Sequence, residues 1–149
     1  MARIEIRQAS ISDLDVLLPL FDAYRQFYRQ ASDLDGARAF LLARFEQGES
    51  VVFLAYVDGV PRAFTQLYPS FSSTAMARTF VLNDLFVAPE VRRCGVATAL
   101  LDFAADYGRS VGAVRLSLAT EVTNRSAQEL YEGAGWDRDS AFCGFKLAL

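Results

Sequence analysis

The chain has 149 residues, a formal net charge of -3 at pH 7 and 52% hydrophobic residues. This length suits one domain with a substantial apolar core, so we expect a single domain over residues 1–149. The mildly acidic balance argues against a nucleic-acid partner. No segment approaches the ~20 apolar residues that cross a bilayer, and the N-terminus lacks the apolar core of a signal peptide. We therefore expect a cytoplasmic protein with no membrane partner.

The chain contains no histidine and has two cysteines, Cys94 and Cys143. Two cysteines are too few for a disulfide framework. Without histidine, the usual zinc sites and Ser-His or Cys-His catalysis are excluded, and we expect no metal. A general base must then be a carboxylate, a tyrosine, a backbone group or water.

The first half of the chain alternates between strand and helix patterns. Ser12 is a candidate N-cap, Pro19 predicts a kink but not a break, and Gly48 should end the second helix. Asp58-Gly59 is a hairpin signal, and residues 69–73 predict a loop. The elements expected here are a strand over 3–7, helices over 12–28 and 34–47, and strands over 51–57 and 61–68.

The second half predicts a strand-helix-strand unit followed by a short helix, and its two strands should be parallel. The elements expected here are a strand over 76–87, a helix over 95–110, a strand over 114–119, a helix over 127–132 and one or two strands within 136–149. The fold class that follows is α/β (α+β), with a mixed, mostly antiparallel sheet of six to seven strands and about four helices.

The segment 85–98 carries the most specific signal, because an apolar strand runs into a basic turn and a helix begins at once. The first amides of a helix have no partner within it and carry the positive end of its dipole, which favours an anion. Gly95 permits a tight turn and a close approach of the backbone. Arg92 and Arg93 add positive charge, and Thr98 offers a hydroxyl. The sequence therefore predicts a pyrophosphate site.

Two motifs resemble those of the Gcn5-related N-acetyltransferase (GNAT) superfamily. Arg92-x-x-Gly95-x-Ala97 resembles its Arg/Gln-x-x-Gly-x-Gly/Ala signature, although many members have glycine at the positions of Arg93 and Ala97. The segment from Asn124 to Trp136 resembles its second motif, Asn-x-x-Ala-x-x-Leu-Tyr-x-x-x-Gly-Phe. The motifs follow in the family's order, and the resemblance covers the whole chain. It implies the GNAT fold and acetyl-coenzyme A (acetyl-CoA) as co-substrate.

The resemblance also implies a role for each motif residue. The strand edge at 85–87 would pair with the pantetheine arm, and the amide near Val87 would face the acetyl oxygen as an oxyanion donor. Asn124 would bind the cofactor arm, and Tyr131 would protonate the departing thiolate. Read alone, Tyr131 would be a core tyrosine. The expected cofactor-binding residues are Leu85, Phe86, Val87, Arg92, Arg93, Cys94, Gly95, Val96, Ala97, Thr98 and Asn124.

Asp84 is the expected general base, because a carboxylate within an apolar run needs a purpose or a partner. A structural hydrogen bond is the alternative. Polyamine acetyltransferases have a similar Leu-Glu-Asp-Phe-Phe-Val stretch, and Asn83 replaces its first carboxylate, which argues against polyamines. In the superfamily the first two helices border the acceptor site. Tyr24, Tyr28 and Asn83 are therefore candidate acceptor contacts, although both tyrosines could simply pack on the core, and the loop 69–73 could close the pocket.

The function expected from these features is acetyl transfer from acetyl-CoA to a primary amine, directly within a ternary complex. A small-molecule amine is favoured over a protein lysine or N-terminus. The alternatives are a non-catalytic acyl-CoA binding or sensing domain and a structural interaction module. An apolar C-terminal strand would offer an edge to a second copy, so a homodimer is an open alternative to a monomer.

Overall fold

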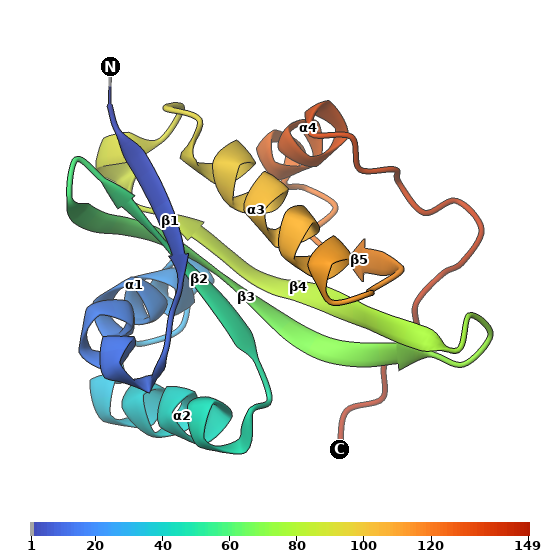
Figure 1. Ribbon diagram of the computed structural model, residues 1–149, viewed down its shortest axis with the longest axis horizontal. Helices are drawn as coiled ribbons and strands as arrows, with labels where there is room; N and C mark the ends of the chain where they lie inside the picture. Colours follow the sequence, from blue (N-terminus) through green and yellow to red (C-terminus); the bar gives the residue numbers. More distant parts are fainter. Residues whose placement is uncertain (1) are drawn as a thin grey trace. The chain divides into compact units, whose positions relative to one another are not determined.

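The computed structural model describes residues 2–149, which fall into a unit ending at Ala119 and a unit of residues 120–149. The single domain expected from the length stays a prediction. The elements of the first unit (Figure 1) are β1 (Ile4–Gln8), the 3₁₀ turn η1 (Ile11–Asp13), α1 (Leu14–Phe27), α2 (Leu34–Gln47), β2 (Val51–Val57), β3 (Val60–Ser72), β4 (Ala77–Val87), the 3₁₀ turn η2 (Pro89–Val91), α3 (Val96–Ser110) and β5 (Arg115–Ser117).

The first unit is built on one sheet of five strands in the order β1-β2-β3-β4-β5. Its first three pairings are antiparallel, and β4 pairs with β5 in parallel after the crossover through α3. Helices α1 and α2 cover one face and α3 covers the other (Figure 1). The mixed, mostly antiparallel sheet with helices is thus confirmed. The prediction of six to seven strands was wrong, because the described residues form five.

Strand β2, which lies between β1 and β3, is buried on both faces. Its residues Val52 and Leu54 belong to the apolar cluster formed with α1 and α2. Between them, Phe53 points to the other face, where its ring lies 5.0 Å from that of Phe103 and 5.3 Å from that of Tyr107 on α3. This alternation follows from the two-residue period of a strand. It explains why β2 reads as a continuous apolar run.

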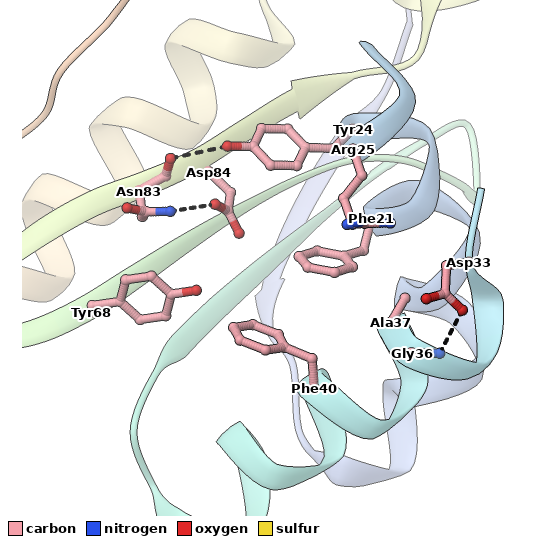
Figure 2. Close-up of a pocket in the computed structure, with 10 residues that line it drawn as sticks. All are labelled: Phe21, Tyr24, Arg25, Asp33, Gly36, Ala37, Phe40, Tyr68, Asn83 and Asp84. Atoms are coloured by element: carbon pink, nitrogen blue, oxygen red, sulfur yellow. Dashed lines mark hydrogen bonds between the residues drawn. The ribbon is translucent and has the colours of Figure 1, made fainter. Parts of the chain in front are cut away.

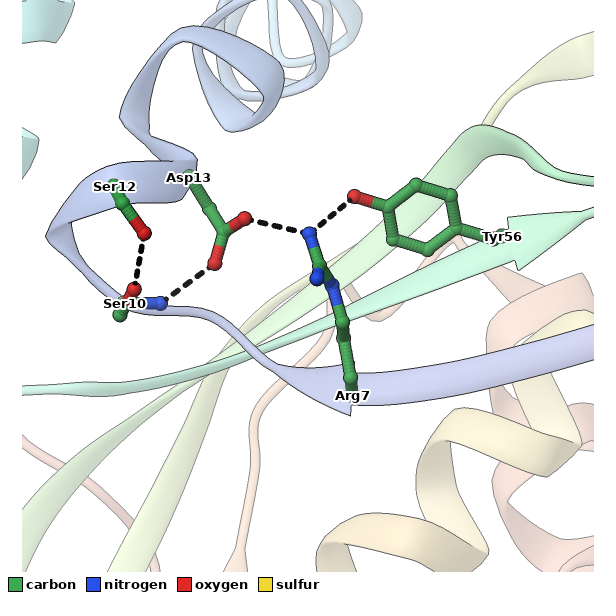
Figure 3. Close-up of polar contacts among 5 residues, drawn as sticks. All are labelled: Arg7, Ser10, Ser12, Asp13 and Tyr56. Carbon is green, nitrogen blue, oxygen red and sulfur yellow. Dashed lines mark hydrogen bonds and ion pairs between the residues drawn. The ribbon is translucent and has the colours of Figure 1, made fainter.

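The chain between β1 and α1 is fixed by a small polar network (Figure 3). The Asp13 carboxylate accepts a hydrogen bond from the Ser10 N–H at 2.9 Å and pairs with Arg7 at 2.6 Å. Arg7 also donates to the Tyr56 hydroxyl on β2 at 2.8 Å. The expected N-cap at Ser12 was wrong, because the 3₁₀ turn η1 begins the helical segment at Ile11, with Ser10 as its N-cap.

Strand β3 continues through the segment where a loop was expected. Pro69 lies opposite Phe80 and Ser70 lies opposite Thr79 on β4. The pairing of β2 with β3 stops at Val51, the first residue of β2, which lies opposite Leu67, so the residues of β3 beyond Leu67 pair with β4 alone. A proline is tolerated on such an edge, since its missing N–H removes no ladder hydrogen bond there. The loop prediction for residues 69–73 was therefore wrong.

The second unit contains α4 (Arg125–Gly133), and its described residues 134–149 form neither helix nor strand. The strands expected within 136–149 were therefore wrong. The apolar side chains of Phe142, Phe145 and Leu147 are exposed. An alternating pattern supplies side chains for a strand but no partner to complete its hydrogen bonds. A homodimer stays a prediction.

Candidate functional site

A β-bulge in β4 shapes the candidate site. Gln66 of β3 lies opposite Asp84, whereas the next residue, Leu67, lies opposite Leu82, which leaves Asn83 without an opposite residue. A bulge of this kind bends a strand and re-aims its side chains. Here it buries Asp84, whose exposed fraction is 2%. The Asp84 carboxylate accepts hydrogen bonds from Gln66 Nε2 at 2.5 Å and from Asn83 Nδ2 at 2.8 Å.

A pocket of about 420 Å³ lies between α1, α2 and this bulge (Figure 2). Polar residues from β4, α1 and the start of α2 share it with Gly36 and Ala37 of α2. Its aromatic lining consists of Phe21, Tyr24, Phe40 and Tyr68. Its polar lining consists of Arg25, Asp33, Asn83 and Asp84. The volume and the mixed lining suit a small organic ligand with both apolar and polar groups.

The electrostatics of the pocket centre on Asp84. Burial raises the pKa of the Asp84 carboxyl above its ordinary value, although hydrogen bonds from Asn83 and Gln66 act against the shift. Burial and the nearby Asp84 carboxylate raise the pKa of the Tyr68 phenol to about 12 and that of the Tyr24 phenol further. Both phenols are therefore neutral at pH 7. A buried carboxylate with a raised pKa is a better proton acceptor than an exposed one.

The outer edge of β4 is open beside this pocket. Strand β5 pairs with β4 only from Thr79 to Val81, so in the described chain no strand covers that edge further on. The Ala88 N–H donates to Arg62 of β3 at 2.8 Å. Because successive N–H groups of a strand point to opposite edges, the Val87 N–H faces the open edge. This arrangement fits the expected pairing with a pantetheine arm.

The turn after β4 presents backbone N–H groups. Arg93 has a φ of 62° and Gly95 a φ of 82°. Gly95 is the N-cap of α3, no side chain caps it, and no acidic residue lies in the first turn. The first backbone bond of the helix runs from the Ala99 N–H to Gly95. The preceding N–H groups, at residues 96–98, can therefore bind an anion, as expected for a pyrophosphate.

Arg92 turns toward β4 in this structure. Its Nε donates to the Val87 carbonyl oxygen at 2.9 Å. Its guanidinium lies 5.8 Å from the ring centroid of Phe86 and 5.6 Å from that of Phe27. Arg92 therefore holds the turn against the end of β4, a role that the sequence pattern did not indicate. Cys94 is exposed, and its sulfur lies 3.6 Å from the carbonyl oxygen of Arg92.

The structure brings three of the predicted site residues together. Tyr24, Asn83 and Asp84 line one pocket, and the Tyr24 hydroxyl donates to the Asn83 carbonyl oxygen at 3.2 Å. Tyr28 packs edge-on against Tyr24, with ring centroids 5.1 Å apart, and is not one of the residues lining that pocket.

Asn124 and Tyr131 belong to the second unit. The Asn124 side chain caps α4 by accepting a hydrogen bond from the Ala127 N–H at 3.1 Å. The Tyr131 ring lies 6.1 Å from that of Trp136, which follows the C-cap residue Ala134 by two positions. Their expected roles toward the cofactor stay predictions.

Several lining residues were not predicted from the sequence. Phe21 and Phe40 read as core residues of amphipathic helices, and Tyr68 as the end of a strand. The spacing Asp33-x-x-Gly36 was the one local signal, because an N-cap aspartate commonly bonds the N–H three residues on. That bond is present, from the Gly36 N–H to Asp33 Oδ1 at 2.9 Å.

Among the described residues no helix combines the length and apolar character needed to cross a bilayer. Within the same part of the chain, no three His, Cys, Asp or Glu side chains come together as a metal site.

Known proteins resemble the chain over most of its length. Residues 17–136 match the model of the acetyltransferase (GNAT) family. An uncharacterized N-acetyltransferase of Bacillus subtilis, YhfO, is 51% identical over 144 residues, which are 97% of each chain. The crystal structure of a probable acetyltransferase has a TM-score of 0.93 and 42% identity over 97% of each chain. An aminoglycoside N-acetyltransferase in complex with CoA has the same fold, with a TM-score of 0.82 and 19% identity over 100% of this chain and 97% of that one.

Proposed function

The chain belongs to the acetyltransferase (GNAT) family, and we propose that it transfers the acetyl group of acetyl-CoA to a primary amine of a small molecule. The observation that carries this proposal is the position of Asp84. It is buried in a pocket of about 420 Å³, and the residues that follow it on β4 form the open strand edge. Consecutive residues of one strand therefore serve both an acceptor pocket and a slot for the thioester.

The open edge and the turn fit the co-substrate. Acetyl-CoA, when bound, supplies an activated acetyl group as a thioester. The uncapped N–H groups at the start of α3 would hold its diphosphate, and the edge at 85–87 would hold its pantetheine arm. The Val87 N–H faces that edge and is the candidate oxyanion donor.

Asp84 would start the reaction, because an alkyl ammonium must lose a proton before its nitrogen can attack. The Asp84 carboxylate accepts that proton, directly or through water. The amine nitrogen then forms the new C–N bond as the C–S bond breaks. We assign the Tyr131 phenol as the donor of the proton that the thiolate takes up. The nitrogen loses a second proton as the amide forms, and a proton taken up from solvent in its place restores the Tyr131 phenol. The proton held by Asp84 returns to solvent with the products.

A small acceptor is favoured by the enclosure of Asp84 among aromatic side chains. Residues of α1 and α2 border the pocket, and the Asp84 carboxylate is nearly inaccessible at its floor. The name of the aminoglycoside N-acetyltransferase shows that this fold serves small amines in another protein.

The second candidate is a non-catalytic acyl-CoA sensor, which would use the same turn and strand edge. A sensor has no need for a buried carboxylate in a second pocket, so the position of Asp84 favours the enzyme.

The test is thiol release from acetyl-CoA with a panel of amines, with acetylated products identified by mass spectrometry. We expect amine-dependent release that falls in Asp84→Asn. Binding of CoA without release for any amine would favour the sensor. Binding is read independently, since CoA at ~100 times its dissociation constant should stabilise the fold by ~2.7 kcal/mol.

A further inference from the structure

Opposite charges line the pocket at the end away from Asp84. Figure 2 shows the Asp33 side chain, from the start of α2, beyond the Phe21 ring as seen from Asp84, and the Arg25 side chain, from α1, beside that ring. Resting on the proposed function, we propose that the acceptor is an α-amino acid with an amine at the end of its side chain. Its side-chain amine would meet Asp84, its α-carboxylate Arg25 and its α-ammonium Asp33.

Arg25 is held at the pocket wall by the backbone. Its Nη1 donates to the Ala31 carbonyl oxygen at 3.2 Å, which orients the guanidinium and leaves its other donors for a ligand. A planar guanidinium matches a carboxylate with two parallel hydrogen bonds. The nearby Asp22 carboxylate does not line the pocket and is bonded to the Ser32 hydroxyl at 2.6 Å and the Asp33 N–H at 3.0 Å. A ligand carboxylate can therefore compete for Arg25.

Asp33 is placed by Gly36. Its Oδ1 caps α2, and a Cβ at position 36 would overlap its Oδ2 atom, so the glycine leaves that space to the carboxylate. Among the described ion pairs, Asp33 and Arg25 do not pair with each other, although both line this pocket. Two opposite charges that share a pocket without joining form a site for a zwitterion.

The middle of the pocket suits a chain of methylene groups. The rings of Phe21 and Phe40 are nearly parallel, at an interplanar angle of 9° and a centroid distance of 5.9 Å. Apolar stems of basic side chains pack well on such surfaces while their charged ends reach polar partners. A simple diamine would fill the same space and could place its second cation at Asp33, but it would leave Arg25 without a carboxylate partner.

Three acceptors of matched length test the assignment. L-lysine and cadaverine differ only by the α-carboxylate, and L-lysine and 6-aminohexanoate differ only by the α-ammonium. We expect kcat/KM for L-lysine to exceed that for each of the others by about tenfold or more, the worth of one good charged contact. Acetylation should occur on the ε-nitrogen, as read by NMR of the product.

Two charge-neutralising variants assign the contacts. Arg25→Gln should remove the advantage of L-lysine over cadaverine, and Arg25→Lys should keep part of it. Asp33→Asn should remove the advantage of L-lysine over 6-aminohexanoate, and it keeps a good N-cap for α2. The matched controls are Arg38→Gln and Asp35→Asn, two residues of α2 outside the pocket lining, and they should change neither ratio.

Equal kcat/KM values for the three acceptors with the unsubstituted protein would overturn the inference and leave the acetyltransferase proposal intact. The inference also fails if both neutralising variants keep the full preference for L-lysine. If no amine in any panel is acetylated while CoA still binds, the proposed function falls, and this inference falls with it. Thermal unfolding with and without CoA shows that each variant is folded.

Discussion

The Nε2 atom of Gln66 lies 2.5 Å from the Oδ2 atom of Asp84, and the carbonyl oxygen of the same amide has no partner among the described residues. Both side chains are buried. A half turn of the amide would bring its oxygen to Asp84 in place of its nitrogen, which suits a protonated carboxyl group. Gln66 can therefore serve either protonation state of Asp84, as a base that gains and loses a proton requires.

Asp84→Asn should abolish most activity and stabilise the fold. The variant loses the proton acceptor, so kcat/KM should fall by about 10²–10⁴-fold. It also removes a buried charge, and the turned Gln66 amide can accept a hydrogen bond from the new side chain. We expect a gain of roughly 0.5–2 kcal/mol in the free energy of unfolding at pH 7. Thermal unfolding measures it, and Asp102→Asn on α3 is the exposed control.

The stability gain should depend on pH with a definite sign. Because burial raises the pKa of Asp84 in the folded state, its contribution to stability is fully present below the unfolded pKa of ~3.9. That contribution is lost as the pH rises through the folded pKa. The gap between variant and parent should therefore widen from pH 3 toward neutrality. A gap that narrows over this range would show that the folded pKa is not raised.

Gly95→Ala should separate backbone strain from ligand binding. Gly95 has a φ of 82°, and Gly59, in the hairpin between β2 and β3, has a φ of 81°; neither position has an atom within 4 Å of an added Cβ. Alanine should therefore lower the free energy of unfolding by a similar ~1–2 kcal/mol at both positions. Only Gly95→Ala should weaken CoA binding, since its methyl group enters the expected diphosphate site. Calorimetry with CoA, with Gly59→Ala as control, checks this, and equal affinities would place the diphosphate elsewhere.

Arg92→Lys should weaken acetyl-CoA binding although it preserves the charge. The Nε donor to the Val87 carbonyl oxygen is lost, and a lysine ammonium does not reproduce its direction. A hydrogen bond of about 1–1.5 kcal/mol corresponds to about a tenfold rise in KM for acetyl-CoA. Arg93→Lys is the control, since Arg93 would act only through its charge in the proposed site. Similar KM values for the two variants would contradict a positioning role for Arg92.

Local turn chemistry explains which elements could be predicted from the sequence. The predicted bounds of α2 and β2 are confirmed at both ends. Gly48 ends α2 with a φ of 62°, and Asp58-Gly59 turns the hairpin with φ values of 50° and 81°. These signals lie within a few residues of the boundary that they set. The extent of β3, and the lack of strands among the described residues after α4, depend on partner strands, which no local pattern specifies.

The site divides in the same way. Asp84 and Tyr24 could be predicted as candidate site residues. A carboxylate within an apolar strand is unusual, and so are two tyrosines four residues apart on one helix face, as Tyr24 and Tyr28 are. Tyr68, Phe40 and Arg25 could not, since they become pocket residues only when α1 and α2 pack beside the bulge. The bulge itself has no local sequence signal.

Ser32→Ala should destabilise the fold at the connection between α1 and α2. The Ser32 hydroxyl and the Asp33 N–H hold the Asp22 carboxylate, and these bonds lower the pKa of Asp22. A depressed pKa contributes stability above the unfolded value of ~3.9, which is lost as the pH falls through the folded pKa. The free energy of unfolding of the variant should be lower by about 1–2 kcal/mol at pH 7, and by less at low pH. Ser12→Ala, in η1, serves as control, and a loss independent of pH would contradict the role of Asp22.

Tyr131→Phe should lower kcat and leave KM for acetyl-CoA unchanged. The proposed phenol acts only on the departing thiolate, so its loss affects the transition state and not the bound co-substrate. A thiolate whose thiol has a pKa of ~8.5 is a fair leaving group without protonation. We therefore expect kcat to fall about tenfold, less than the loss of a general acid usually causes. Tyr56→Phe, which removes the hydroxyl bonded to Arg7, is the control for loss of a phenol. Steady-state kinetics measure kcat and KM, and calorimetry measures CoA binding. An unchanged kcat would mean that the thiolate takes its proton from solvent. Weaker CoA binding would mean that Tyr131 holds the co-substrate instead.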